Sequence, residues 1–267
     1  MNGFSACLKK DRLEFIRSRK NIICLVVLLG CGAMVLVTTI FLPALLDKVM
    51  DAGSFFSDDT SLADFMSKFF PEDLKGSAGI LASDIGVFYG LLAVAFTFSL
   101  VPDDIKSGRV ILPLCAGHSI KSFVISKKLI YSIWMSLPVL AAYMIYYLIG
   151  SNFLQNNYDM LAAFVNGLVL LFSIFAIINI TIDLSIIFRH KYQTLALMIG
   201  IILVAPDALS FFKVGKYFPT YLLTYTYNSS NEFQYIVIPA LITIGLIVAL
   251  DLFAIKFKLK LDVDDRR

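Results

Sequence analysis

The sequence predicts an all-α, polytopic membrane protein with six transmembrane helices, and three observations support this fold class. Of the 267 residues, 58% are hydrophobic and 16% are charged, whereas soluble globular chains carry about 25% charged residues. The mean hydropathy is +0.80. The apolar residues gather into six long runs, and the basic residues are divided unequally between the segments that join those runs.

Each run is near or above the roughly 20 residues that a helix needs to cross a hydrocarbon core about 30 Å thick. The predicted spans are, in chain order, Ile22 to Leu46, Ile80 to Val101, Leu129 to Gly150, Met160 to Phe188, Thr194 to Phe212 and Tyr235 to Ile255. We therefore expect one transmembrane domain, with a six-helix bundle over 22–255, an interfacial helix over 1–20 and a tail over 256–267. Six crossings place both termini on the same side.

Basic residues predict which side that is. On the side of the termini lie 18 of the 23 Lys and Arg residues: Lys9, Lys10, Arg12, Arg17, Arg19, Lys20, Lys106, Arg109, Lys121, Lys127, Lys128, Arg189, Lys191, Lys256, Lys258, Lys260, Arg266 and Arg267. The other five are Lys48, Lys68, Lys75, Lys213 and Lys216. By the positive-inside rule both termini are cytoplasmic. The first run is too long for a signal-peptide core, so we expect no cleavable signal.

The N-terminal tail has the pattern of an amphipathic helix. Phe4, Leu8 and Phe15 share one helical face, and most of the basic residues point elsewhere. A basic helix with an apolar stripe next to a span is expected to lie in the plane of the membrane interface. A plain topology anchor of Lys and Arg is the alternative.

The first external loop, from Asp47 to Gly79, is net acidic and contains a predicted short helix from Ser61 to Phe70. A solvated loop and a binding role both remain open for this loop.

The cytoplasmic segment 102–128 is longer than a turn requires. It contains an acidic pair, a Ser-Gly-Arg step, an apolar run with Pro, a polar break and a Lys-rich helix. In this order it resembles the loop of the permease subunits of ABC type-2 exporters, a likeness that extends to the six spans and the N-terminal helix. The matching positions are Asp103 or Asp104, Ser107, Gly108, Leu112, Pro113, Ser119, and Lys127 or Lys128. That family usually has Glu at the position of Asp103 or Asp104.

The resemblance implies that this loop couples the bundle to a separate ATPase subunit in the bacterial cytoplasmic membrane. The coupling residues would be Asp103, Asp104, Lys106, Ser107, Gly108, Arg109 and Pro113. The sequence has no G-x-x-x-x-G-K-[ST] motif, so ATP and Mg would be bound by the partner, and we expect no cofactor in this chain. The expected assembly has two ATPase subunits and a second copy of the permease or a paralogue. We expect no nucleic-acid partner, because the basic residues cluster at the span ends.

Polar residues inside the apolar runs are candidates for the transport pathway, because burying them in lipid is costly. Asn166, Asn179 and Asp183 lie in the fourth run. We expect Asp183 to form an ion pair with Arg189 or Lys191, and a pathway role is the alternative.

The fifth run contains a predicted helix break, followed by an aromatic cluster. This region forms the external gate in the resembled family, and an aromatic anchoring belt is the alternative. The gate residues would be Pro206, Asp207, Phe211, Phe212, Tyr217, Phe218 and Tyr221.

The 23 Phe and eight Met residues predict an apolar cavity that suits a hydrophobic or amphipathic cargo, such as a small peptide, a toxin or a lipophilic drug. The chain resembles the small permeases of peptide export and of bacteriocin self-immunity, and the choice between export and immunity stays open. A secondary transporter would show interrupted helices in both halves, and only one such helix is predicted. An intramembrane enzyme would need a catalytic set at depth, but both histidines, His118 and His190, lie at the rim, so we expect no catalytic residues.

Four cysteines, Cys7, Cys24, Cys31 and Cys115, are all predicted to be cytoplasmic or inside a helix. We therefore expect neither an external disulfide nor a metal site, and we interpret Cys24 and Cys31, which share a face of the first span, as packing residues.

Overall fold

The computed structural model describes residues 3–52, 73–111, 115, 119–154, 157–188, 191–204, 219, 221–224 and 234–254. All regular elements in these ranges are helices, which confirms the predicted all-α class. They are α1 (Gly3–Arg17), α2 (Lys20–Ala52), α4 (Leu74–Asp84), the π-helix η1 (Ile85–Tyr89), α5 (Gly90–Thr97), α6 (Leu100–Lys106), α8 (Ile120–Gly150), α9 (Met160–Ile187), α10 (Lys191–Leu203), α12 (Tyr221–Thr224) and α13 (Gln234–Phe253).

Five helical segments within the described residues are long and apolar enough to cross a membrane. They are Lys20–Phe41, Leu74–Lys106, Ile120–Gly150, Met160–Ile187 and Ile236–Phe253. The described part of the remaining predicted span is α10, whose 13 residues extend about 20 Å, short of a hydrocarbon core. The structure thus supports a multi-pass membrane protein with five spans by this measure.

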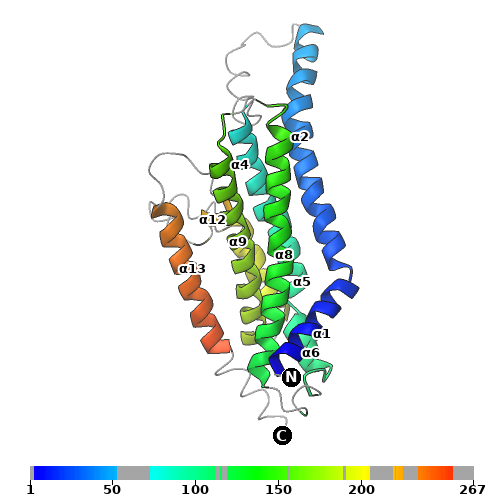
Figure 1. Ribbon diagram of the computed structural model, residues 1–267, viewed down its shortest axis with the longest axis vertical. Helices are drawn as coiled ribbons and strands as arrows, with labels where there is room; N and C mark the ends of the chain where they lie inside the picture. Colours follow the sequence, from blue (N-terminus) through cyan, green and yellow to red (C-terminus); the bar gives the residue numbers. More distant parts are fainter. Residues whose placement is uncertain are drawn as a thin grey trace.

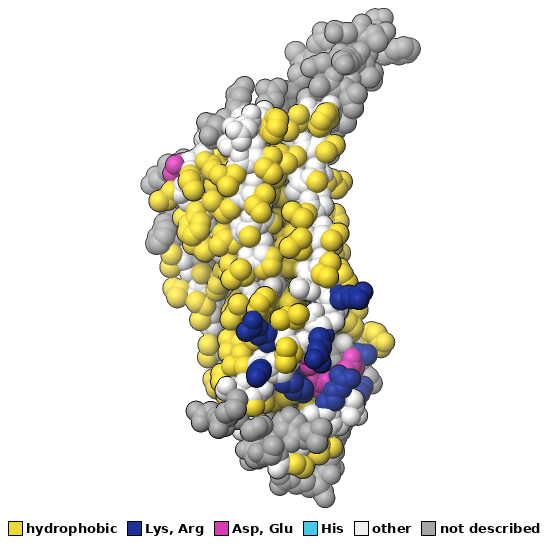
Figure 2. Space-filling view, turned by 45° about the vertical axis from the view of Figure 1, so that its right-hand side comes forward, with side chains coloured by type: hydrophobic (Ala, Val, Ile, Leu, Met, Phe, Trp, Pro, Cys, Tyr) yellow, Lys and Arg dark blue, Asp and Glu magenta, His cyan; other side chains and the backbone are white. Residues whose placement is uncertain are grey.

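The helices form an elongated bundle in which α8 and α9 pack along each other (Figure 1). Helix α1 crosses the lower end of the bundle and contacts α8, while α13 packs against α9 at the periphery. We call the end that holds α1 and the final turn of α13 the basic end, because Lys and Arg side chains form a band there below a largely apolar surface (Figure 2).

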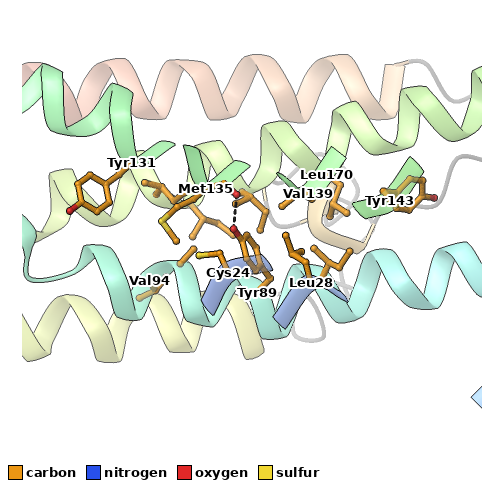
Figure 3. Packing of buried hydrophobic residues seen from close by; sticks show 14 of the residues in the cluster. Cys24, Leu28, Tyr89, Val94, Tyr131, Met135, Val139, Tyr143 and Leu170 are labelled. Atoms are coloured by element: carbon orange, nitrogen blue, oxygen red, sulfur yellow. Dashed lines mark hydrogen bonds between the residues drawn. The ribbon is translucent and has the colours of Figure 1, made fainter. Parts of the chain in front are cut away.

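Two irregular helices meet in the middle of the core. Helix α8 contains Pro138, which has no N–H and so leaves the carbonyl of Trp134, four residues before it, without its helical bond. The Tyr89 hydroxyl, at the end of the π-helix, donates to the Met135 carbonyl of that turn at 2.6 Å (Figure 3). This bond holds the turn that the proline disrupts, one residue after the carbonyl that the proline frees.

Candidate functional site

The apolar stripe of α1 packs against the bundle. The ring of Phe15 is fully buried and meets the ring of Tyr131 edge-on at 5.2 Å and that of Trp134 at 6.4 Å, and Leu8 packs against the same core. The position of α1 in the plane of the membrane interface stays a prediction, but Leu8 and Phe15 of its apolar stripe face the bundle and not lipid. Its residues contact protein because α1 docks along the first turns of α8.

A glycine turn ends α6 and aims the following arginine back at that helix. Gly108 has φ +73°, a conformation that strains any residue with a Cβ atom. Its N–H donates to the Ile105 carbonyl at 3.3 Å, and the N–H of Arg109 donates to the Asp104 carbonyl at 3.0 Å. This pair of bonds is a Schellman motif. The Ser-Gly-Arg step noted in the sequence thus forms the C-terminal cap of α6.

A buried ion cluster joins α1, the end of α6 and α8. The Lys127 ammonium lies 2.7 Å from Asp104, 3.6 Å from Glu14 and 3.7 Å from Asp11, and its side chain is 0% exposed. Arg109 completes the cluster, 3.5 Å from Asp104 and 3.9 Å from Glu14. We call these five residues the Lys127 cluster. Three segments far apart in the sequence are fixed to one buried positive charge.

Burial governs the electrostatics of the cluster. It raises the pKa of the Asp11 carboxyl above its usual value of 3.8, while Lys127 and the Ser126 hydroxyl, which donates to Asp11, act in the opposite direction. Two of the three carboxylates, those of Asp11 and Asp104, are almost completely buried. Ionising them without Lys127 would leave uncompensated charge in a medium of low dielectric constant.

The two neighbouring aspartates of the coupling segment have different surroundings. Asp104 is buried in the Lys127 cluster, whereas Asp103 has an exposed side chain and pairs with Lys191 at the start of α10 at 3.1 Å. The sequence left open which carboxylate takes the acidic position. Of the two aspartates, only Asp104 pairs with Lys127 of α8, which in turn holds Asp11 and Glu14 of α1.

Asp183 belongs to a second buried ion group, at the side of α8 that faces α9 and α13. Both of its carboxylate oxygens accept from the Lys128 ammonium, at 2.8 and 2.9 Å, and Asp251 accepts from the same ammonium at 2.5 Å. The expected Lys191 partner is wrong, because Lys191 pairs with Asp103; Arg189 lies outside the described residues. An ion pair at Asp183 was predicted correctly, but its partner was not.

The two amides of the fourth run are buried and hydrogen-bonded inside the bundle. Asn179 donates to the Ser132 hydroxyl at 2.9 Å and to the Phe175 carbonyl at 2.7 Å. Asn166 donates to the Tyr158 hydroxyl at 2.5 Å, so these amides link α9 to α8 and to the segment before α9. A pathway role for either residue stays a prediction.

Several predicted site residues lie outside the described residues. These are Pro113 of the coupling segment and Pro206, Asp207, Phe211, Phe212, Tyr217 and Phe218 of the predicted gate; the predicted helix from Ser61 to Phe70 does too. Tyr221 is half-buried in α12 and packs against a small cluster that contains Val169. Lys106 and Ser107 are exposed at the end of α6.

Sequence reasoning missed the two carboxylates that α1 contributes to the Lys127 cluster. Asp11 and Glu14 are three residues apart and therefore lie on one helical face. A pair of acids on one face of an otherwise basic helix is a signal that could have marked them as partners of a buried lysine.

A groove with a volume of about 790 Å³ runs beside the cluster. It is lined by Ala6, Lys9, Lys10, Leu13, Glu14, Arg17, Ser18 and Arg109. In the part of the chain that the structure describes, no group of three or more His, Cys, Asp or Glu side chains could hold a metal ion. Cys24 is buried in the core, where it packs close to Leu28 and Tyr89 (Figure 3).

Comparisons with protein-family models, with curated proteins and with solved structures find no match for this chain. A functional assignment therefore has to come from the residues themselves.

Proposed function

We propose that this chain is the permease subunit of an ATP-driven exporter of the ABC type-2 class, energised by a separate ATPase subunit. Its cargo would be a hydrophobic or amphipathic molecule, such as a small peptide or a lipophilic drug. The observation that carries the proposal is the Lys127 cluster, because it ties the predicted coupling segment rigidly to α1 and to a spanning helix. A loop that only connected two spans would not need three carboxylates around one buried lysine.

The cluster suits the transmission of force. A partner that pushes on the turn after α6 displaces Asp104, which is 2.7 Å from Lys127 of α8. Because Lys127 is also held by Asp11 and Glu14, α1 has to follow the same displacement. Separating these charges in a buried site is costly, so the segment would move as one body with the bundle. This is what a coupling element between an ATPase and a permease requires.

The proposed complex contains two permease chains and two ATPase subunits in the bacterial cytoplasmic membrane, with both permease termini in the cytoplasm. The largely apolar shell of the bundle is consistent with a membrane location. The basic end would face the ATPase, which agrees with the positive-inside rule. The pathway would lie at the interface between two permease chains, as in other closed two-fold assemblies.

A proton-coupled secondary transporter is the second candidate. The buried ion group of Lys128, Asp183 and Asp251 favours it. Carboxylates paired inside a membrane commonly mark proton relays. The position of the group weighs against this reading, because Asp183 is four residues from the end of α9 and Asp251 is two residues from the end of α13. Transporter sites of that kind lie near the midplane of the bilayer.

The test is affinity purification of the full chain from native membranes, followed by mass spectrometry and an ATPase assay on the purified material. We expect a soluble ATPase at about one copy per permease, as a two-plus-two assembly requires. A chain that purifies alone and without ATPase activity, and that exchanges cargo for protons in vesicles, would replace the proposal by the second candidate.

Adjacent aspartates provide a matched pair for the coupling step. Asp104→Asn removes a charge from the Lys127 cluster, whereas Asp103→Asn removes the same charge from an exposed site. We expect Asp104→Asn to reduce cargo-stimulated ATP hydrolysis several-fold and Asp103→Asn to leave it near the wild-type value. Equal activities of the two variants would contradict the coupling role of the cluster.

A further inference from the structure

The groove beside the Lys127 cluster is more basic than the contacts within the chain require. Its lining contains four cations, Lys9, Lys10, Arg17 and Arg109, and one carboxylate, that of Glu14. The Glu14 carboxylate already pairs with the Lys127 ammonium at 3.6 Å and with the Arg109 guanidinium at 3.9 Å. The groove thus keeps an excess of positive charge.

Two cations of α1 in the groove lining, Lys9 and Arg17, are available to a ligand. Lys9 and Arg17 are both exposed, and within the described ranges neither has a carboxylate within 4 Å. Lys10 lies over the Phe123 ring at 5.6 Å and leaves its ammonium exposed. Clusters of Lys and Arg without acidic partners attract anions.

The groove lies at the level where the apolar surface of the bundle ends. Helix α1 runs along the first turns of α8, since Lys10 contacts Phe123 and Phe15 contacts Trp134. The band of basic side chains in Figure 2 borders the apolar surface at this height. In a bilayer this is the depth of the lipid headgroups, where Trp, Lys and Arg side chains are enriched.

Apolar side chains accompany the charges on the outer face of α1. Leu13, which lines the groove, is 45% exposed, and Ile16 beside it is 41% exposed. A free inorganic anion would gain nothing from them, whereas an amphipathic anion would cover both. The combination of cations and exposed aliphatic groups matches a phospholipid in which the phosphate and the start of the acyl chains are close together.

We propose that this groove binds the headgroup of an anionic phospholipid, with the phosphate held by Lys9, Arg17 and Arg109 and the glycerol end resting on Leu13. The Arg side chains can each donate two parallel hydrogen bonds to phosphate oxygens. Because Arg109 belongs to the Lys127 cluster, a bound lipid would also hold the turn after α6 against α1. This inference requires only that the chain is embedded in a membrane, and it does not depend on the proposed ATPase partner.

The test titrates the full chain, purified in detergent, with phosphatidylglycerol and separately with phosphatidylcholine, and counts bound lipids by native mass spectrometry. The groove variant is Lys9→Gln with Arg17→Gln. The matched control is Arg12→Gln with Arg19→Gln, which removes the same charge from α1 and its C-terminal end but outside the groove lining. All four residues are exposed, so the variants should fold, and an unchanged elution volume in size exclusion checks this.

We expect the wild type to retain phosphatidylglycerol in preference to phosphatidylcholine. One basic residue near an anionic lipid surface contributes about a fivefold gain in binding, so the groove variant should bind phosphatidylglycerol roughly 25-fold more weakly. The control loses the same charge but no side chain of the groove lining, so it should bind phosphatidylglycerol several-fold more tightly than the groove variant. Equal binding of the two lipids by the wild type, or equal losses in the groove variant and the control, would overturn the proposal.

Inorganic phosphate distinguishes a lipid site from a site for a soluble anion. If the groove takes a lipid, millimolar phosphate should leave the bound phosphatidylglycerol in place, because phosphate makes no contact with Leu13 or Ile16. Displacement of the lipid by phosphate, with the same loss in the groove variant, would assign the groove to a soluble phosphate and reject the lipid.

Discussion

Lys127→Met is the substitution that most directly tests the buried ion cluster. Methionine fills a similar volume with flexible apolar atoms, so the change removes the charge with little loss of packing. In the wild type the ammonium is 2.7 Å from Asp104 and 3.7 Å from Asp11, and both carboxylates are nearly buried. The variant therefore leaves two buried carboxylates without their shared cation, and the exposed Arg109 can only partly offset the charge of Asp104.

The expected loss is large for a single substitution. Removing one partner of a buried ion pair costs about 3–5 kcal/mol, because the remaining charge stays desolvated. Since 1.4 kcal/mol corresponds to a factor of ten, the unfolding equilibrium should shift by roughly 150- to 4,000-fold. Replacing Lys127, Asp11 and Asp104 together by apolar residues of similar size should restore most of this loss, because no buried charge is then left unpaired.

The single tryptophan provides the assay. Trp134 contacts Phe15 of α1 and lies 5.6 Å from the Arg12 guanidinium, so its fluorescence reports whether α1 is docked. Unfolding of the purified chain by dodecyl sulfate in mixed micelles, followed at this residue, gives the free energy of unfolding. Lys121→Met is the matched control, because Lys121 is exposed on the same helix and should change stability by less than about 0.5 kcal/mol.

The pH dependence of the free energy of unfolding that Lys127→Met loses provides a second readout. Burial raises the pKa of Asp11, so this carboxyl favours the folded state at a pH below its normal value of 3.8, and that contribution disappears as the pH rises through the raised pKa. Lys127 lowers this pKa, so Lys127→Met should move the transition to higher pH. The penalty of the variant should therefore shrink as the pH falls toward the raised pKa of Asp11, because the buried carboxyl is then neutral in more of the folded molecules.

One result would refute this reasoning. If Lys127→Met and Lys121→Met unfold at the same dodecyl sulfate fraction at every pH, the cluster does not hold α1 against α8. The short distances would then have no energetic consequence.

Two further contacts give predictions for unfolding by dodecyl sulfate. Tyr89→Phe removes the hydroxyl that donates to the Met135 carbonyl and should cost about 1–2 kcal/mol. A cost near zero would mean that the hydroxyl adds nothing to a carbonyl that the helix already satisfies. Asp183→Asn should cost more than Asp251→Asn, because the Asp183 side chain is fully buried and accepts with both oxygens, whereas the Asp251 side chain is 33% exposed. Equal free-energy costs for the two substitutions would contradict the inference that the buried Asp183 is the main partner of Lys128.

The sequence predicts that helices exist better than it predicts where they begin. Helix α8 starts at Ile120, nine residues before the predicted span, because Ser119 caps it by accepting from the Ser122 N–H at 3.1 Å. Hydropathy placed Lys127 and Lys128 outside the span, since charged residues are costly in lipid. Burial against carboxylates removes that cost, and a hydropathy pattern contains no information about such partners.

The same limit applies to the candidate site. The Asp-Asp pair, Ser107, Gly108 and Arg109 were identified from local order, and the turn that they form is local. The remaining members of the cluster are Lys127 of α8 and two acids of α1, and the bond between Ser126 and Asp11 joins residues 115 positions apart. The two acids on one face of α1 can indicate a buried cation as their partner, but no local pattern specifies which cation over that separation, so the pairing itself is seen only in three dimensions.

The adjacent residues Lys127 and Lys128 connect the Lys127 cluster to the second buried ion group, which contains Asp183 and Asp251. Successive residues of an α-helix point about 100° apart, so Lys127 faces α1 and the end of α6 while Lys128 faces α9 and α13. Lys127 and Lys128 are consecutive residues of the same helix, so their backbone positions move together. A displacement of Asp104 that moves Lys127 therefore moves Lys128 as well, and Asp183 and Asp251 have to follow or lose their partner. Four elements of the bundle are thus mechanically linked through one turn of α8.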